Sequence, residues 1–192
     1  LFGMKVREPK SIVASGGRYG YPNQDTETPD TLQTLFEYDN FTMLWENAVG
    51  IDGGNYGQDE GIAFIGNNGT LQIDRGGWQV ISEKDYQNDR KLKLETVPYQ
   101  KSKGSGLDFH TKNFVEAIRN NDPNSLACGI DSGSIACINA HMGNISYKVG
   151  RKIFWDKESQ NFGNDKQAND LISPKYNNGF KFCLLYTSDA AD

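Results

Sequence analysis

The sequence predicts an α+β domain that has an open, mostly antiparallel β-sheet with helices packed on one face. Strand-like segments follow one another in runs between tight turns, and they do not alternate with helices as in a doubly wound nucleotide-binding fold. Two segments in the second half repeat apolar residues with helical spacing. The chain has 192 residues, 36% of them hydrophobic, which is enough for one domain with a buried core.

Turn residues separate the predicted strands. Asp39-Asn40 is a two-residue hairpin connection, and the Asn-Gly and Gly-Gly pairs at 68–69 and 76–77 suit tight turns. In the segment 41–49, alternation places every second residue on the same face, and neither face is wholly polar, so we expect both to be partly covered. One face carries Phe41, Met43, Trp45, Asn47 and Val49. The predicted strands are 11–15, 31–38, 41–49, 61–65, 70–74, 78–83, 93–99 and 151–156.

The segment 131–151 is predicted to form the central helix, with one apolar face against the sheet and a strip of small residues beside it. The small residues allow another backbone to approach closely. We expect Asp131 or Ser132 to cap the first turn and Gly150 to end the helix in a left-handed conformation. The apolar face consists of Ile135, Ile138, Met142, Ile145 and Val149, and the small-residue strip consists of Gly133, Ala136, Ala140 and Gly143.

Two further helices are predicted on either side of this one. The first begins with Asp108 as its cap and stops at Asp122-Pro123, and its buried side carries Phe114, Ala117 and Ile118. The other spans 164–172, with Asn164 as its cap. Two or three helices in total would cover one face of the sheet and leave the other free as a subunit interface.

Composition argues against several classes of function. The 20 Lys and Arg are interspersed with 25 Asp and Glu, which gives a net charge of −5 and no basic block, so we expect neither a nucleic acid partner nor binding to an anionic membrane. No apolar run reaches the roughly 20 residues that cross a bilayer. The three cysteines lack CxxC spacing and are expected to be buried or incidental thiols, and the two histidines lack metal-ligand spacing, so no metal site is predicted.

A few residues could nevertheless carry chemistry. Trp45, Glu46 and Arg75 could line a sugar site, where an aromatic face and bidentate partners are useful. Core packing for Trp45 and a turn-stabilising charge for Arg75 are the favoured alternatives. His110 and His141 could act as a general base or a metal ligand, or could be hydrogen-bonded within their helices. The cluster FIGNNG precedes a strand, so it is interpreted as a hairpin turn and not as a phosphate-binding loop.

The two ends of the sequence do not resemble natural ends. The last ten residues, CLLYTSDAAD, can be written back as a transposon-type sequencing adapter, so we expect a domain over 1–182 and an adapter-derived tail over 183–192. A short terminal strand is the alternative. Leu1-Phe2-Gly3 resembles the last turn of a helix, which indicates a fragment of a longer chain.

Seven segments in order carry a resemblance that covers essentially 1–182. They are PKSIVASGG, ETPDT, FEYDNFTMLWE, GIAFIGNNGTLQIDRGGW, HTKNFVEAIR, AHMGNISYKVGRKIFWD and DKQANDLI. Together they resemble the C-terminal domain of the Gfo/Idh/MocA oxidoreductases, in its bacterial type. The resemblance implies that a missing N-terminal Rossmann domain binds NAD or NADP and carries the catalytic residues. It also implies that the helix side of this domain's sheet shapes the substrate pocket, and that its open side serves homo-oligomerisation.

The resemblance therefore implies that this chain is the substrate-binding and oligomerisation domain of an NAD(P)-dependent sugar or polyol oxidoreductase. The fragment alone is expected to bind no cofactor and to be inactive. The alternatives are a fragment of a glycosidase of the same fold that holds NAD tightly, or a non-catalytic assembly module. Relatives are cytoplasmic or exported, so the resemblance assigns no compartment. The small-residue strip of the central helix is expected to be exposed, because its neighbour would be the missing domain. The candidate substrate-binding residues are Trp45, Arg75, His110, His141 and Asn144, and Asn113 lies in the same matched motif as His110.

Overall fold

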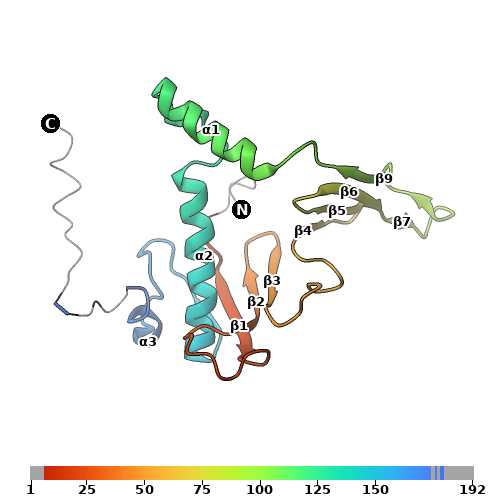
Figure 1. The fold of residues 1–192 in the computed structure, drawn as a ribbon. Helices are drawn as coiled ribbons and strands as arrows, with labels where there is room; N and C mark the ends of the chain where they lie inside the picture. Colours follow the sequence, from red (N-terminus) through yellow and green to blue (C-terminus); the bar gives the residue numbers. More distant parts are fainter. Residues whose placement is uncertain (1–6, 174–175, 177, 180–192) are drawn as a thin grey trace.

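The computed structural model describes residues 7–173, 176 and 178–179 (Figure 1). Its strands are β1 (Ser11–Gly17), β2 (Thr31–Glu37), β3 (Thr42–Ala48), β4 (Ile62–Ile65), β5 (Gly69–Ile73), β6 (Gly77–Ser82), β7 (Lys84–Asp85), β8 (Lys91–Leu92), β9 (Val97–Lys101) and β10 (Ile153–Phe154). Its helices are α1 (Gly106–Asn120), α2 (Ile130–Val149) and α3 (Lys166–Asn169), with a 3-10 turn, η2 (Pro123–Ser125). The expected tail over 183–192 and the domain end at Phe182 lie outside the described residues.

The predicted α+β class is confirmed, and every pair of strands within the described residues is antiparallel. The strands form two four-stranded sheets. The first sheet has the order β10-β1-β2-β3 and the second has the order β4-β5-β6-β9, while β7 and β8 form a separate pair. The chain passes from the first sheet to the second through the glycine-rich residues 49–61, where Gly54 and Gly57 adopt the left-handed conformation that favours glycine.

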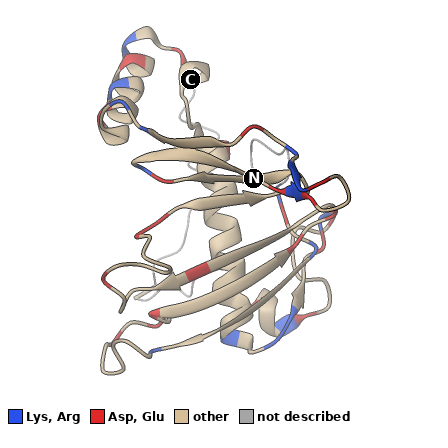
Figure 2. Ribbon diagram, turned by 90° about the vertical axis from the view of Figure 1, so that its right-hand side faces the viewer, with Lys and Arg blue, Asp and Glu red and all other residues tan. Residues whose placement is uncertain are grey.

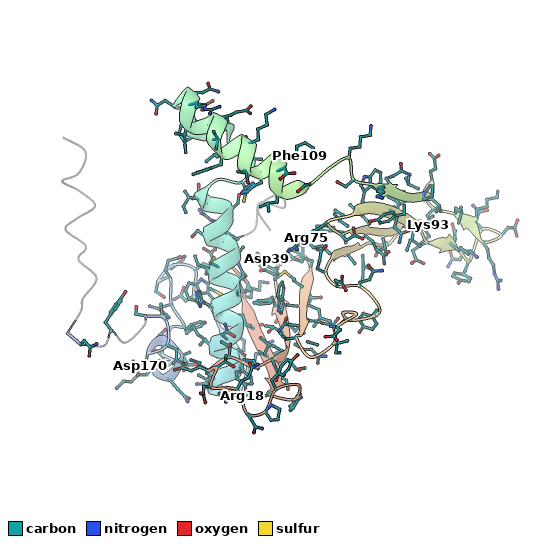
Figure 3. All side chains as sticks on the ribbon, viewed as in Figure 1. Arg18, Asp39, Arg75, Lys93, Phe109 and Asp170 are labelled. Carbon is teal, nitrogen blue, oxygen red and sulfur yellow. The ribbon has the colours of Figure 1, made fainter. Side chains whose placement is uncertain are left out.

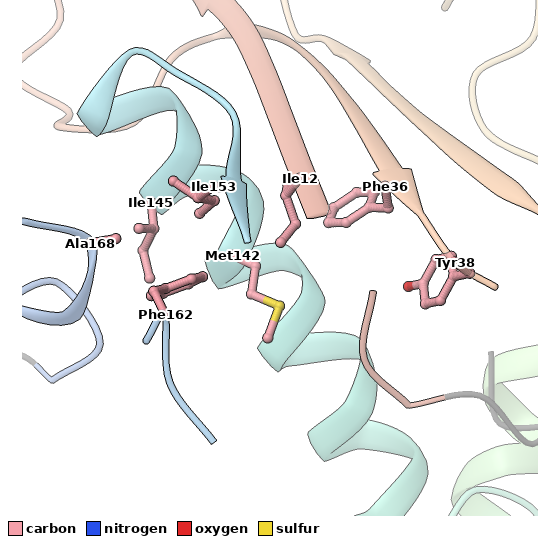
Figure 4. Close-up of a cluster of buried hydrophobic side chains, with 8 residues drawn as sticks. All are labelled: Ile12, Phe36, Tyr38, Met142, Ile145, Ile153, Phe162 and Ala168. Atoms are coloured by element: carbon pink, nitrogen blue, oxygen red, sulfur yellow. The ribbon is translucent and has the colours of Figure 1, made fainter. Parts of the chain in front are cut away.

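Helix α2 covers one face of the first sheet and forms the core with it (Figure 4). Side chains alternate along β2, so that its inward residues are buried and its outward residues are exposed. Tyr38 stacks on Phe41 with ring centroids 4.4 Å apart, which closes the hairpin predicted at Asp39-Asn40. The buried cluster consists of Ile12, Phe36, Tyr38, Met142, Ile145, Ile153, Phe162 and Ala168.

The end of α2 was predicted correctly and its start was not. Gly150 adopts φ 70°, and its N–H bonds to the carbonyls of Ser146 and Tyr147. At the start, Gly129 is the N-cap and no side chain caps the helix. Neither Asp131 nor Ser132 can serve, because the helix already begins at Ile130. The Asp131 carboxylate instead lies 3.7 Å from the Arg7 guanidinium.

The apolar face of α2 is narrower than its spacing predicted. Ile135, Met142 and Ile145 are buried, but Ile138 is 41% exposed. Ile138 is not part of the core because it borders a surface groove between α2 and the chain near Arg7. On the small-residue strip, Ala136 and Ala140 are exposed as expected.

The prediction of exposure is wrong at the fourth member of the strip, Gly143. This residue is buried against Thr34 and Phe36 of β2, so part of the strip brings α2 close to the first sheet. The contact is possible because glycine has no side chain.

Helix α1 is where the sequence prediction was most incomplete. Ser105, not Asp108, is the N-cap, and its hydroxyl accepts a bond of 3.3 Å from the backbone N–H of Asp108. Of the predicted buried side only Ala117 is buried, while Phe114 and Ile118 are exposed. The reason is that α1 packs on η2 and projects away from both sheets (Figure 1).

Smaller differences concern other elements. Helix α3 is shorter than predicted and is capped by Asp165, not by Asn164. Strand β9 begins at Val97, four residues later than predicted. Cys128 and Cys137 are free and exposed, so of the two expectations, buried or incidental thiols, burial is wrong for both.

Candidate functional site

Trp45 lies on the helix-covered face of the first sheet. It is the cross-strand partner of Thr34, and cross-strand partners in an antiparallel pair share a face. Thr34 is buried under α2, whereas Trp45 lies on the edge strand β3 and is 57% exposed. The indole is therefore presented to solvent beside the helix, and core packing does not explain Trp45.

The position of α2 over β1 and β2 is what leaves this indole uncovered. A Cβ atom added to Gly143 would lie 3.2 Å from the Thr34 hydroxyl oxygen and 3.5 Å from the Phe36 ring, so the helix and β2 are in close contact at this point. Ala136 and Ala140 lie on the same flank of the helix as Gly143 and are exposed. The result is an indole and a flank of small side chains on the same face of the first sheet.

Asn139 is a positioning residue that the sequence analysis missed. Its side-chain oxygen accepts a 2.7 Å bond from the Tyr38 hydroxyl, and its amide N–H groups reach the carbonyls of Arg7 (2.9 Å) and Ile135 (2.8 Å). Burial, together with the charge of Glu8, raises the pKa of Tyr38. In the sequence, Asn139 stands out as an amide within an otherwise apolar face of the helix. Its hydrogen bonds fix α2 against the end of β2 and against the chain near Arg7.

Ser146 also fixes the position of α2, about two turns after Asn139. Its hydroxyl accepts a 3.0 Å bond from the backbone N–H of Ala14 and lies 2.9 Å from the carbonyl of Arg151 and 3.3 Å from that of Ile12. Ser146 is fully buried. A helix residue thus bonds to the backbone of β1 and of the segment before β10, and the three elements are held in one arrangement.

Asp30 orders the loop at the far end of the first sheet. Its carboxylate accepts bonds from the backbone N–H groups of Tyr19, Gly20 and Tyr21 and from the Thr31 hydroxyl, at 2.7 to 3.2 Å. Burial alone would raise the pKa of Asp30, but these hydrogen bonds stabilise the charged form and lower the pKa to about 2. The loop therefore keeps its charged anchor down to strongly acid pH.

The structure does not bring the five predicted site residues together. Arg75 is exposed in the turn between β5 and β6, where its backbone N–H donates to Glu60 at 2.8 Å; Figure 3 shows it at the end of the second sheet. His110 is exposed on α1. His141 and Asn144 lie on the side of α2 that faces away from the first sheet. Within the described residues no hydrogen bond or ion pair joins any two of the five.

Asn113, from the same motif as His110, has a structural role in the described part of the chain. Its side-chain nitrogen donates to the carbonyl of Ser125 (2.9 Å), and its oxygen accepts from the N–H of Ala127 (2.8 Å). It fixes the loop that joins α1 to α2.

Two grooves on the described surface are lined by residues other than the five predicted site residues. The first, of about 350 Å³, is lined by Arg7, Glu8, Ser134, Ile135, Ile138 and Gln160. The second, of about 480 Å³, runs along α1 and is lined by Leu107, Asp108, Thr111, Lys112, Val115, Glu116 and Arg119.

The described part of the chain contains neither a metal-type cluster nor a membrane-spanning helix. No three His, Cys, Asp or Glu side chains gather there as a metal ion requires. None of the described helices has the length and apolar character to cross a membrane. Acidic and basic residues are interspersed over the strands, loops and helices (Figure 2).

Comparison with known proteins agrees with this architecture. The search of curated proteins finds no match. Two solved structures share the fold. One is named "putative oxidoreductase yvaA" and comes from Bacillus subtilis (14% identity, TM-score 0.52, 78% of this chain and 46% of that one). The other is named "putative oxidoreductase" and comes from Klebsiella pneumoniae (10% identity, TM-score 0.50, 85% of this chain and 47% of that one). This chain thus spans slightly under half of each. The family model described as "Oxidoreductase family, C-terminal alpha/beta domain" matches residues 85–182. The chain therefore belongs to the Gfo/Idh/MocA oxidoreductase family and carries its C-terminal domain.

Proposed function

We propose that this chain is the substrate-binding and oligomerisation domain of an NAD(P)-dependent sugar or polyol oxidoreductase. The observation that carries the proposal is the division of the first sheet into two unlike faces. One face is covered by α2 and presents Trp45 beside it, and the other is open and carries an exposed apolar row. Family membership and the share of the related structures that the chain spans support a two-domain parent.

Dinucleotide binding is assigned to an N-terminal Rossmann domain of the parent and not to these residues. A dinucleotide site needs a glycine-rich turn that leads from a strand into a helix, so that N–H groups meet the phosphates. Here the glycine turn at 66–69 joins β4 to β5, and Gly66 and Gly69 bond to each other across the hairpin. The donors of this turn are used within the sheet, so this turn does not fit the phosphates of NAD or NADP.

The helix side of the first sheet is proposed to face the substrate. An exposed indole can stack on the apolar C–H face of a sugar or polyol. The exposed flank at Ala136 and Ala140 has no long side chains and would allow the Rossmann domain to approach. The substrate would then lie between the Trp45 indole and the domain that supplies the cofactor. The other four predicted residues would contact the substrate only if that domain brings the substrate near them. They are Arg75, His110, His141 and Asn144.

The opposite face is proposed to bind a second copy of the chain. Val13, Leu35 and Leu44 are cross-strand partners on three neighbouring strands, and all three are exposed. Phe154 of β10 is exposed on the same face, in the neighbouring row opposite Ser11. Such a row on an otherwise solvated sheet is typical of a subunit interface. The interface and the substrate surface would therefore lie on opposite sides of one sheet.

Adjacent residues of β3 provide a matched test. Trp45 and Leu44 are 57% and 59% exposed and point to opposite faces. In the parent enzyme, Trp45→Ala should raise the KM for the sugar or polyol about tenfold, equivalent to about 1.4 kcal/mol, and leave the oligomer intact. Leu44→Lys should dissociate the oligomer in sedimentation velocity and leave the KM of the surviving protein within about twofold.

The outcomes separate the two halves of the proposal. An unchanged KM in Trp45→Ala would remove the substrate role, and an unchanged sedimentation coefficient in Leu44→Lys would remove the interface. Product analysis in the same assay distinguishes the reaction. Net oxidation of the sugar with reduction of the cofactor supports an oxidoreductase, whereas hydrolysis without net reduction would show a glycosidase.

A further inference from the structure

Helix α1 carries an apolar stripe that the rest of the described chain leaves exposed. Its members recur at i, i+4, i+7, i+8 and i+11, which places them along one side of the helix. We call this side the α1 stripe, and it consists of Leu107, Thr111, Phe114, Val115 and Ile118. Leu107, Phe114 and Ile118 are each more than half exposed. Leu107, Thr111 and Val115 also line the groove along α1.

The contacts that hold α1 in this chain lie on a different side of the helix. Ala117 is the buried residue of α1, and Asn113 bonds to the loop over 125–127. Neither belongs to the α1 stripe. A helix in a protein is stabilised mainly by packing of its amphipathic face. The α1 stripe is therefore expected to have a partner that is not among the described residues.

The chain enters this domain beside α1. Arg7, the first described residue, accepts a 2.9 Å bond at its carbonyl from Asn139, and its guanidinium lies 3.7 Å from Asp131 in the first turn of α2. The loop over 125–127, which Asn113 of α1 fixes, immediately precedes the start of α2. Both α1 and Arg7 are therefore attached to the N-terminal half of α2.

We propose that the α1 stripe is the surface on which the Rossmann domain of the parent docks. The inference rests on the proposed function, which supplies that domain. Six residues precede Arg7 in the sequence and span at most about 20 Å, so a domain upstream of Leu1 is tethered close to α1. Ala136, in the second turn of α2, is exposed near the same end. One docked domain can thus cover the α1 stripe and the small-residue flank of α2.

A tethered domain is favoured over other occupants of the α1 stripe. A short linker gives that domain an effective concentration in the millimolar range. A second copy would have to bind from solution, and its net charge of −5 repels an identical chain. The residues that follow α3 start from the other end of α2, about 30 Å away for a helix of 20 residues. Asp165 holds α3 there through a 2.8 Å bond from Arg151 (Figure 1).

Thiol labelling of the parent enzyme tests this contact. Ile118→Cys places a thiol on the α1 stripe, and Glu116→Cys is the matched control on the opposite, polar side of the helix. Peptide mass spectrometry reads each new cysteine separately from the native ones. Glu116→Cys should react with a maleimide about tenfold faster than Ile118→Cys, because the docked domain covers only the stripe. Equal rates in a parent that oxidises its substrate would overturn the inference and leave the proposed function standing.

The same labelling separates the Rossmann domain from a second copy. Protection of Ile118→Cys should persist in the monomeric parent, prepared by dilution and checked by sedimentation velocity, because the two domains are parts of one chain. Reaction of Ile118→Cys as fast as Glu116→Cys in the monomer would show that a second copy covers the stripe. That result would overturn the inference.

A charge on the α1 stripe should uncouple the two domains. Ile118→Lys places a charge in the docked surface, while Asn120→Lys adds the same charge away from the stripe, and both residues are exposed in this domain. In the parent, Ile118→Lys should lower kcat/KM about tenfold and leave the Kd for the dinucleotide within about twofold, since docking positions the substrate and not the cofactor. Asn120→Lys should match the wild type. An unchanged kcat/KM in Ile118→Lys would overturn the inference alone, whereas an upstream frame without a Rossmann domain would overturn the proposed function as well.

Discussion

Replacing Met142 by alanine should lower the free energy of unfolding by about 3 kcal/mol, one of the two largest effects expected in this chain. Met142 is 2% exposed and lies at the centre of the buried cluster between α2 and the first sheet (Figure 4). Truncation would remove its contacts and leave a cavity that the strands cannot close, because Asn139 and Ser146 fix the helix on either side. Thermal denaturation followed by circular dichroism should show a Tm lower by roughly 6 to 12 °C.

The matched control is Ile138→Ala, one turn earlier on the same helix. Ile138 was expected on the same apolar face but is 41% exposed, so its truncation should cost less than about 1 kcal/mol. Equal losses in the two variants would mean that α2 packs on the sheet along its whole predicted face. The position of α2 described above would then be incorrect.

Gly16→Ala is the second variant with a large expected effect. A Cβ atom on Gly16 would lie 2.2 Å from the carbonyl oxygen of Thr31 and 3.0 Å from the Cα of Leu32, its pairing partner in β2. Both contacts are with backbone, so no side chain can rotate away and the two strands must separate. We expect a loss of about 3 kcal/mol in urea denaturation.

Gly133→Ala is the control for a change of glycine to alanine as such. Gly133 lies within α2, and an added Cβ would find open space for 4 Å around it. Alanine favours a helix over glycine, so this variant should gain about 0.8 kcal/mol. The account requires opposite signs for the two glycine variants. Destabilisation of both by similar amounts would contradict the close pairing of β1 with β2.

Features set by neighbouring residues could be predicted from the sequence. The Asp39-Asn40 hairpin, the left-handed Gly150 and the side of β3 that carries Trp45 depend on turn chemistry or on alternation. Features set by distant contacts could not be predicted. The side chains of α1 that were expected to be buried are exposed because α1 packs on η2, and sequence spacing does not specify what a helix packs against.

In the candidate site, too, neighbouring residues set some features and distant contacts set others. Alternation places Trp45 on the helix-covered face, but its exposure depends on where α2 crosses the sheet, which Gly143 and Thr34 determine together. Asn139 and Ser146 were missed because their role depends on backbone groups more than 130 residues away in the sequence. The other four site residues were predicted from residue type alone, and in the described part of the chain they do not share one surface. They are Arg75, His110, His141 and Asn144.

The central claim is that this chain is the substrate half of a two-domain oxidoreductase. The most direct measurement is the genomic sequence upstream of the codon for Leu1, read in the same frame. The account predicts a Rossmann unit there, with a strand, a GxGxxG turn and a helix, followed by the rest of a dinucleotide-binding domain. An upstream frame that lacks this unit would contradict the account.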